Sequence, residues 1–277
     1  MLKAILGDKL WFYGLLPNLG SINVFLLIAI YVAICLVGYL LGSINTAIIV
    51  SKVAYGEDIR TKGSGNAGMT NMMRTYGKGP AAITFVGDLL KTLIAMTVGT
   101  LVCGLNAAYL AGFFAILGHI APIYYKFRGG KGVSSTAMFI LYADPLVFLI
   151  VFVMFVIIVG GLKFLSLGSM ICAFVFPYIV YSFENARIDA FIRVNPDIPI
   201  EAIPYLDMRF LRLALMLAIS FIIIFMHRSN IKRLANGTES KFYFKKTQMP
   251  MRNADAGKDT AEGGKKRSLH NIDESDE

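Results

Sequence analysis

Long apolar segments separated by short polar ones dominate this chain. A helix that crosses the roughly 30 Å hydrocarbon core of a membrane needs about 20 apolar residues. Five segments come close to that length, and they cover residues 23–41, 80–103, 108–125, 166–183 and 210–226. Composition agrees, because 56% of the residues are hydrophobic and only 16% are charged. The pattern therefore predicts an integral membrane protein built from helices.

Residues 133–160 form a further apolar segment that is either one tilted span or two helices broken at Ala143-Asp144-Pro145. Proline with a neighbouring carboxylate favours the break, since a carboxylate is costly in the membrane unless it is paired or faces water. Basic residues gather in 52–78, in 126–131 and after Met226, whereas 184–207 is acidic. The positive-inside rule puts all three basic regions in the cytoplasm only if 133–160 crosses twice.

The expected fold is therefore all-α, a polytopic membrane protein with seven transmembrane helices, its N-terminus outside and its C-terminus cytoplasmic. Residues 1–20 are expected to form an extracytoplasmic interfacial lead-in, and residues 21–247 are expected to form the membrane-integral domain. Residues 248–277 are expected to be a disordered charged cytoplasmic tail, because they contain too few apolar residues to fold. Residues 42–55 either extend the first span or form a short interfacial helix.

The net charge of +9 does not call for nucleic acid, because the basic residues flank apolar segments, where they orient the chain and meet anionic lipid. Cys35, Cys103 and Cys172 lie in or beside apolar segments without the spacing of metal ligands. They are expected to be small buried hydrophobes, with no disulfide, metal or cofactor.

The polar segment 58–78 is the first candidate for chemistry, because it is glycine-rich and basic between two apolar segments. Its run Gly63-Ser64-Gly65-Asn66-Ala67-Gly68 allows backbone N–H groups to converge on an anion. In the helix expected next, Asn71 and Arg74 share a face and add an amide and a forked cation that suit a phosphate. The alternative is a solvated basic loop whose glycines only make turns.

A second candidate is Gly129-Gly130-Lys131-Gly132, which Ser134 and Ser135 follow at the start of a helix. It lacks the G-x-x-x-x-G-K-[ST] pattern, so nucleotide hydrolysis is not supported. Flexible glycines and a lysine still fit a phosphate monoester, although a tight turn with a topology-setting lysine explains them as well.

Other polar residues lie at the ends of apolar segments or within them. His227 and Asn230 share a helix face beyond the last span, where interfacial residues are the default. His119 lies within a span, which favours a position facing the protein interior. Asp88 and Lys91 suit an internal ion pair, and Ser166 and Ser169 suit either helix entry or phosphate binding.

Together these blocks resemble the bacterial glycerol-3-phosphate acyltransferase family that uses acyl-phosphate as donor. The matching runs are G-S-I at Gly42, D-I-R-T-K-G-S-G-N-A-G-M-T-N-M-M-R at Asp58, G-H-I-A-P at Gly118, K-F-R-G-G-K-G-V at Lys126, S-L-G-S at Ser166 and H-R-S-N-I-K-R-L-A-N-G-T-E at His227. Asn45, Thr92 and the Ser134-Ser135 pair depart from the usual pattern.

The resemblance implies seven spans, a cytoplasmic active site in the bacterial cytoplasmic membrane, and transfer of an acyl chain from acyl-phosphate to the 1-hydroxyl of sn-glycerol 3-phosphate. It implies that the acyl-phosphate head contacts Ser64, Asn66, Asn71, Arg74 and, secondarily, Arg60. It also implies a glycerol 3-phosphate site at Gly129, Gly130, Lys131 and Gly132, completed by His227, Asn230 and Ser169. Apart from the resemblance, the hydroxyl of Ser135 and the position of His119 within a span make both residues further binding candidates.

Two other classes compete with this interpretation. An organic-phosphate transporter also needs cationic loops, but it predicts inverted repeats and mid-membrane charges, and no repeat is visible here. A lipid-surface scaffold leaves the clustered asparagine, serine and histidine residues unexplained. The chain has no His-x-x-x-x-Asp signature of acyl-CoA-dependent acyltransferases.

Overall fold

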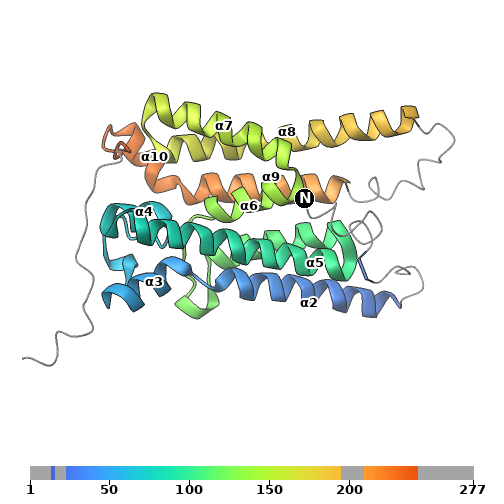
Figure 1. Cartoon of the computed structure of the whole chain (residues 1–277), viewed down its shortest axis with the longest axis horizontal. Helices are drawn as coiled ribbons and strands as arrows, with labels where there is room; N and C mark the ends of the chain where they lie inside the picture. Colours follow the sequence, from blue (N-terminus) through green and yellow to red (C-terminus); the bar gives the residue numbers. More distant parts are fainter. Residues whose placement is uncertain (1–13, 16–22, 195–208, 243–277) are drawn as a thin grey trace, which may run out of the picture.

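The computed structural model describes residues 14–15, 23–194 and 209–242, and these form a bundle of long helices aligned with the long axis of the molecule (Figure 1). The described elements are, in order, α2 (Val24–Ser43), α3 (Thr46–Tyr55), η2 (Ile59–Thr61), α4 (Met69–Tyr76), α5 (Lys78–Ile120), η3 (Ile123–Tyr125), α6 (Val133–Ala143), α7 (Pro145–Leu162), α8 (Leu165–Val194), α9 (Arg209–Met226) and α10 (Arg228–Ala235). Nearly all of the lead-in 1–20 and the whole tail 248–277 lie outside the described residues.

Helix α5 is a tight helical hairpin. Its backbone leaves helical geometry at Cys103 and Gly104, where Gly104 has a φ of +74°. A Cβ added to Gly99 would meet the backbone of Ala107, so the two arms run antiparallel in close contact. The two apolar segments expected on either side of residue 104 are confirmed. Glycine is needed at this turn because other residues rarely adopt a positive φ.

Small residues bring α2 close to the second arm of α5. A Cβ on Gly38 or on Gly42 would overlap the backbone carbonyl group of Ala111 or Ala115, respectively. This spacing of two glycines four residues apart is typical of closely packed membrane helices, whose backbones approach when no side chain separates them. The arrangement fixes α2 against the hairpin that carries Asp88, Lys91 and His119.

The expected break between α6 and α7 is confirmed at Asp144-Pro145. Asp144 caps α7 by accepting hydrogen bonds from the backbone N–H groups of Leu146 and Val147, and Pro145 occupies the first turn. The Asp144 carboxylate also pairs with Arg187 Nη1 at 2.5 Å, which offsets the cost of its burial. Helix α6 has eleven residues, fewer than a full crossing requires.

Five described helical segments are long and apolar enough to cross a membrane: α2 with its continuation α3, α5, α7, α8 and α9. The acidic loop expected from Glu184 is wrong for residues 184–194, because α8 continues to Val194. Glu184 is 3% exposed and lies 3.3 Å from Nε of Arg212, which is 1% exposed. Pairing inside the bundle allows both charges to lie within helices, a possibility that hydropathy alone does not reveal.

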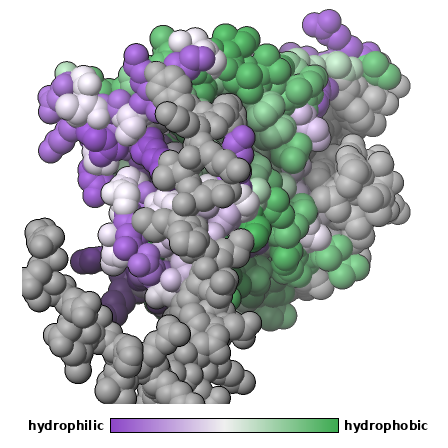
Figure 2. All heavy atoms as spheres, turned by 60° about the vertical axis from the view of Figure 1, so that its left-hand side comes forward, coloured by the Kyte–Doolittle hydropathy of each residue, from purple (hydrophilic) through white to green (hydrophobic). Residues whose placement is uncertain are grey.

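The three short helices α3, α4 and α10 lie at one end of the bundle (Figure 1). Helix α3 is separate from α2, since the chain is extended at Ile44 and Asn45 and the Asn45 side chain caps α3 through the N–H of Ile48. Figure 2 brings this end forward and shows hydrophilic residues gathered on it, beside hydrophobic residues on the flank of the bundle.

Candidate active site

A cavity of about 360 Å³ is lined at one end by residues of α4 and α10 and continues between the long helices. Its polar lining comes mainly from the predicted motifs and comprises Ser64, Asn66, Thr70, Asn71, Arg74, Asp88, His119, Lys131, Ser134, Thr136, Ser166, Ser169, His227, Asn230, Arg233 and Glu239. Its apolar lining includes Phe85, Ala137, Ile140, Phe148, Val151, Phe152, Phe155, Cys172, Ala173, Phe176 and Ile223. The cavity therefore joins a charged compartment to a hydrophobic one.

Asn71 organises the loop that contains Ser64. Its Oδ1 accepts a hydrogen bond from the backbone N–H of Ser64 at 2.9 Å. Its Nδ2 donates to the carbonyl oxygens of Ile59 and Lys62 at 3.2 and 3.0 Å. Because the side chain is 1% exposed and holds both ends of the turn, it positions Ser64 at the cavity wall. The αL conformation of Gly63 places its Cα against Asn71, where a Cβ would collide with the amide.

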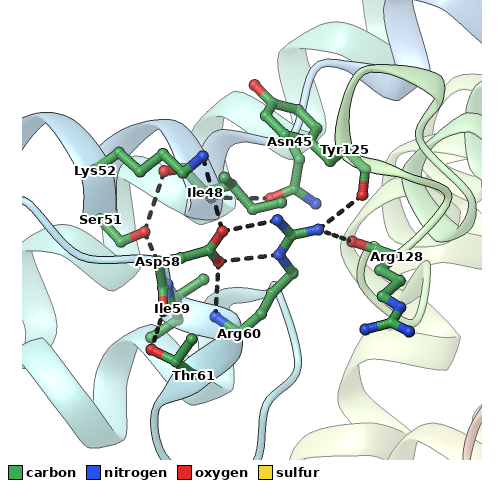
Figure 3. Close-up of polar contacts among 10 residues, drawn as sticks. All are labelled: Asn45, Ile48, Ser51, Lys52, Asp58, Ile59, Arg60, Thr61, Tyr125 and Arg128. Atoms are coloured by element: carbon green, nitrogen blue, oxygen red, sulfur yellow. Dashed lines mark hydrogen bonds and ion pairs between the residues drawn. The ribbon is translucent and has the colours of Figure 1, made fainter.

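Arg60 links two loops outside the cavity lining (Figure 3). Its Nε and Nη2 donate to the Asp58 carboxylate at 2.9 and 2.7 Å. Its Nη1 donates to the carbonyl oxygens of Tyr125 and Arg128 at 2.8 and 3.1 Å. The hydrogen bond from Arg60 holds the pKa of Asp58 below its usual range, despite the opposing effect of partial burial. The secondary anion contact expected for Arg60 stays a prediction, and its observed contacts are those of a tether.

Gly129 and Gly130 donate their backbone N–H groups to the carbonyl oxygens of Ile120 and His119 at 3.0 and 3.1 Å. Neither glycine belongs to the cavity lining. A Cβ on Gly130 would overlap His119 Nε2 and come within 2.8 Å of the Ala67 carbonyl oxygen. Glycine is thus required for a close approach of three segments, and the Gly129-Gly130 pair supports Lys131, which does line the cavity.

A buried charge cluster lies behind this loop. Lys91 Nζ lies 2.9 Å from Asp88 Oδ1, from His119 Nδ1 and from the carbonyl oxygen of Ile44. The expected Asp88–Lys91 ion pair is confirmed, and it is extended by His119, whose Nδ1 lies 3.4 Å from Asp88. The cluster joins both arms of α5 to the end of α2, so it fixes the wall on which Gly130 rests.

Glu239 connects the C-terminal strap, residues 236–242, to the rest of the site. One carboxylate oxygen accepts hydrogen bonds from Ser166 Oγ and Asn230 Nδ2, each at 2.7 Å. The other accepts from Arg233 Nε at 2.7 Å. Burial raises the pKa of Glu239, but the three hydrogen bonds outweigh it and the net pKa is lowered. Glu239 is therefore an anion that positions Asn230 and Arg233.

Three cations share the polar compartment. Arg74 has no hydrogen-bond or ion-pair partner among the described residues, while Lys131 donates to Asn230 Oδ1 and Arg233 pairs with Glu239. Burial, together with the nearby charges of Arg233 and Arg74, lowers the pKa of Lys131 to about 8, although Glu239 opposes this. Positive charge exceeds negative charge beside the cavity, which suits one or two phosphate groups.

His227 presents a neutral imidazole to the same compartment. Its Nδ1 donates to the carbonyl oxygen of Ile223 at 2.8 Å, since a carbonyl can only accept. Burial and the charge of Lys131 lower the pKa of His227 to about 4. At neutral pH the proton therefore stays on Nδ1, and Nε2 is left as an acceptor for a substrate hydroxyl.

The cavity brings together most of the residues that the sequence singled out. It is lined by Ser64, Asn66, Asn71, Arg74, His119, Lys131, Gly132, Ser169, His227 and Asn230, whereas Arg60, Gly129, Gly130 and Ser135 lie outside its lining. Ser135 is buried on another face of α6, because adjacent helical residues point about 100° apart, and Ser134 and Thr136 line the cavity instead.

Sequence reasoning missed the roles of Glu239 and Arg233. Both lie in the block that starts at His227, and the only signal for Glu239 was an acidic residue in a strongly basic segment. A carboxylate in that position indicates an internal partner for the surrounding cations rather than a topology signal.

A compartment that contains Arg74, Lys131 and Arg233 and joins an apolar cavity, in a bundle whose helices are long and apolar enough to cross a membrane, suits a membrane protein that handles an anionic lipid or lipid precursor. Residues 32–237 match the family model described as glycerol-3-phosphate acyltransferase. The chain belongs to this family.

Similar proteins agree with that membership. A glycerol-3-phosphate acyltransferase of Clostridioides difficile is 38% identical over 225 residues, which cover 78% of this chain and 97% of the relative. Two crystal structures of PlsY (YgiH), an integral membrane glycerol 3-phosphate acyltransferase, share the fold with TM-scores of 0.62 and 0.60 at 28% and 27% identity. Each comparison covers 77% of this chain and 96% of the other. One is the glycerol 3-phosphate form and the other the lysophosphatidic acid form.

Proposed function

We propose that this protein transfers an acyl chain from acyl-phosphate to the 1-hydroxyl of sn-glycerol 3-phosphate. The products are 1-acyl-glycerol 3-phosphate, which is lysophosphatidic acid, and inorganic phosphate, in the first step of phospholipid synthesis. The main support for the proposal is that Arg74, Lys131 and Arg233 line the same cavity as a large set of apolar side chains. Both substrates carry a phosphate and one also carries an acyl chain, which matches the two compartments.

The reaction mainly requires that the hydroxyl of one substrate be aligned with the carbonyl group of the other. An acyl-phosphate is a mixed anhydride whose carbonyl is already activated, so the substrate hydroxyl can attack it without a covalent enzyme intermediate. The new ester C–O bond forms, the bond between the carbonyl carbon and the phosphate oxygen breaks, and phosphate leaves with the electron pair. Arg74, with Ser64 and Asn66, would hold the donor phosphate and stabilise the charge that develops. Lys131, Asn230 and His227 would hold glycerol 3-phosphate.

The proton of the attacking hydroxyl goes to the departing phosphate in this proposal. His227 accepts a hydrogen bond from the hydroxyl through Nε2 and orients it, but a pKa of about 4 makes it a weak base at neutral pH. A phosphate oxygen, with a second pKa of about 6, is the better acceptor in the neutral range.

The proposed setting is the bacterial cytoplasmic membrane, with the site on the cytoplasmic side. Seven crossings are counted if the two arms of α5 and the short helix α6 each pass through the membrane, with the N-terminus outside and the C-terminus in the cytoplasm. The basic residues around the polar end of the bundle support this orientation. Labelling of single cysteines placed at residue 62 and at residue 190 from either side of intact cells tests it, since the proposal requires opposite accessibility.

A donor comparison tests the reaction. Purified protein in lipid nanodiscs is given glycerol 3-phosphate with either acyl-phosphate or acyl-CoA of the same chain length. We expect lysophosphatidic acid with acyl-phosphate and at most trace product with acyl-CoA. Product from acyl-CoA at an equal or higher rate contradicts the assigned donor.

Arg74→Ala tests the site. Loss of a charge-assisted contact to phosphate costs about 1.5–3 kcal/mol, so kcat/KM is expected to fall by about 10- to 150-fold. Lys232→Ala is the matched control, because Lys232 is an exposed cation outside the cavity lining. Equal effects of the two substitutions would remove Arg74 from the site.

A further inference from the structure

The wall that α8 contributes to the apolar compartment passes from small side chains near the charged residues to a large one at the far end. On α8 the lining residues are Leu165, at the first position of the helix, followed by Ser166, Ser169, Cys172, Ala173 and Phe176. Four of them follow the i, i+3, i+4, i+7 spacing of one helix face, so a single stripe of α8 forms this wall. Ser166, Ser169, Cys172 and Ala173 are small, and Phe176 has 0% exposure.

The other two walls also end in large side chains, and the α7 wall carries Val151, Phe152 and Phe155 along its length as well. On α6 the lining passes from Val133 through Ala137 to Ile140, and Ile140 is 4% exposed. Helix α7 runs antiparallel to α8, since a Cβ on Gly168 would meet the Phe155 ring and Cys172 Sγ lies 3.6 Å from the Val151 carbonyl oxygen. Continuing that register sets Phe148 of α7 level with Phe176.

Three helices therefore present a large side chain at the far end of one cavity: Ile140, Phe148 and Phe176. Ser166, which hydrogen-bonds to Glu239, marks the charged end. From Ser166 to Phe176 there are ten residues of helix, or about 15 Å at the usual rise per residue. An apolar space that ends at buried side chains such as Phe176 and Ile140 limits how far a chain can extend past them, because close-packed side chains yield little.

We propose that Phe176, together with Phe148 and Ile140, closes the acyl-chain compartment and sets the upper length of the acyl chain that this protein transfers. These three side chains form the floor of the compartment, with Phe176 as the central one. Ala173 lies one helical turn nearer the charged end, and its small side chain leaves the space that the acyl chain fills. The inference rests on the proposed acyl transfer, and it assigns chain-length selection to particular residues.

Two substitutions with opposite expected effects test the floor. Rates are measured in nanodiscs with a series of saturated acyl-phosphates that differ only in chain length. Phe176→Ala deepens the compartment, so the ratio of kcat/KM for the longest donor to that for the shortest is expected to rise at least about tenfold. Ala173→Leu fills it from the side, so the same ratio is expected to fall by a similar factor.

Phe174→Ala is the matched control, because Phe174 lies on the same helix but is 73% exposed and outside the cavity lining. It should leave the ratio unchanged. If Phe176→Ala does not fold, Phe176→Leu replaces it, with a smaller shift in the same direction. General destabilisation cannot move the ratio in opposite directions for Phe176 and Ala173 variants.

The outcomes separate the two proposals. Wild-type protein that transfers no acyl group from any acyl-phosphate of the series contradicts the proposed function. If the wild-type protein is active but neither the Phe176 variant nor Ala173→Leu shifts the ratio, the assigned floor is wrong and the proposed reaction still stands. The same conclusion follows if Phe174→Ala shifts the ratio equally.

Discussion

Glu239 accepts a hydrogen bond from Ser166 Oγ at 2.7 Å, so the C-terminal strap is tied to the first turn of α8. A second link lies beside it, because the backbone N–H of Phe242 donates to the Lys163 carbonyl oxygen at 2.6 Å. The strap therefore closes one side of the polar compartment, and it does so through a residue that also orients Asn230 and Arg233.

Glu239→Gln is expected to lower kcat/KM and thermal stability together. The neutral amide keeps one acceptor oxygen but turns an N–H group toward either Arg233 or the donors of Ser166 and Asn230. Loss of hydrogen bonds to a charged group costs about 1.5–3 kcal/mol, which corresponds to about 10- to 150-fold in kcat/KM. Steady-state kinetics and thermal unfolding in detergent measure both effects. Glu57→Gln is the control, since Glu57 pairs with Lys62 at the surface, and equal effects of the two changes would argue against a special role for Glu239.

The lowered pKa of Lys131 predicts a pH dependence for glycerol 3-phosphate. The ammonium group is charged below a pKa of about 8 and neutral above it, so phosphate binding is strong on the acidic side and weakens as the pH rises through that value. We expect kcat/KM for glycerol 3-phosphate to fall toward about tenfold per pH unit above the pKa. In Lys131→Arg the guanidinium stays charged, and the fall is expected to disappear from the range of pH 7 to 10. A flat wild-type profile over that range would contradict the assignment.

Gly130→Ala is expected to raise the KM for glycerol 3-phosphate by about tenfold or more, because the new methyl group displaces the loop that carries Lys131. The added Cβ cannot coexist with the present positions of the His119 ring and the Ala67 carbonyl oxygen. Initial rates at saturating acyl-phosphate measure the KM. Gly79→Ala supplies the comparison, since a Cβ there meets nothing within 4 Å. An unchanged KM in the Gly130 variant would show that the loop does not position Lys131.

Arg60→Lys is expected to act on stability more than on substrate binding. Lysine cannot reproduce the paired hydrogen bonds to Asp58 together with those to the Tyr125 and Arg128 carbonyl oxygens. The free energy of unfolding is expected to drop by about 1–3 kcal/mol, with a small change in KM. Arg128→Ala provides the control, because only its backbone carbonyl takes part and its side chain is exposed (Figure 3). A large rise in KM without loss of stability would instead support the predicted anion contact.

Features of the local sequence were sufficient to predict those parts of the fold that depend on neighbouring residues. The Asp144-Pro145 break follows from the missing N–H of proline and the capping carboxylate, and the apolar segments follow from the cost of polar groups in lipid. The end of α8 and the burial of Glu184 were not predictable in this way, because the compensating Arg212 comes from a different helix.

The sequence by itself determined that this is a helical membrane protein and which motifs carry its polar chemistry, because hydropathy, turn residues and motif blocks act through neighbouring residues. Tertiary structure alone decided which motif residues face the cavity and which support it. Arg60 and Gly130 lie outside the cavity lining and hold loops together, Asn71 lines the cavity and also holds a loop, and Arg74 and Lys131 face the cavity. Residue type and spacing cannot distinguish these roles, since both depend on contacts between segments far apart in the chain.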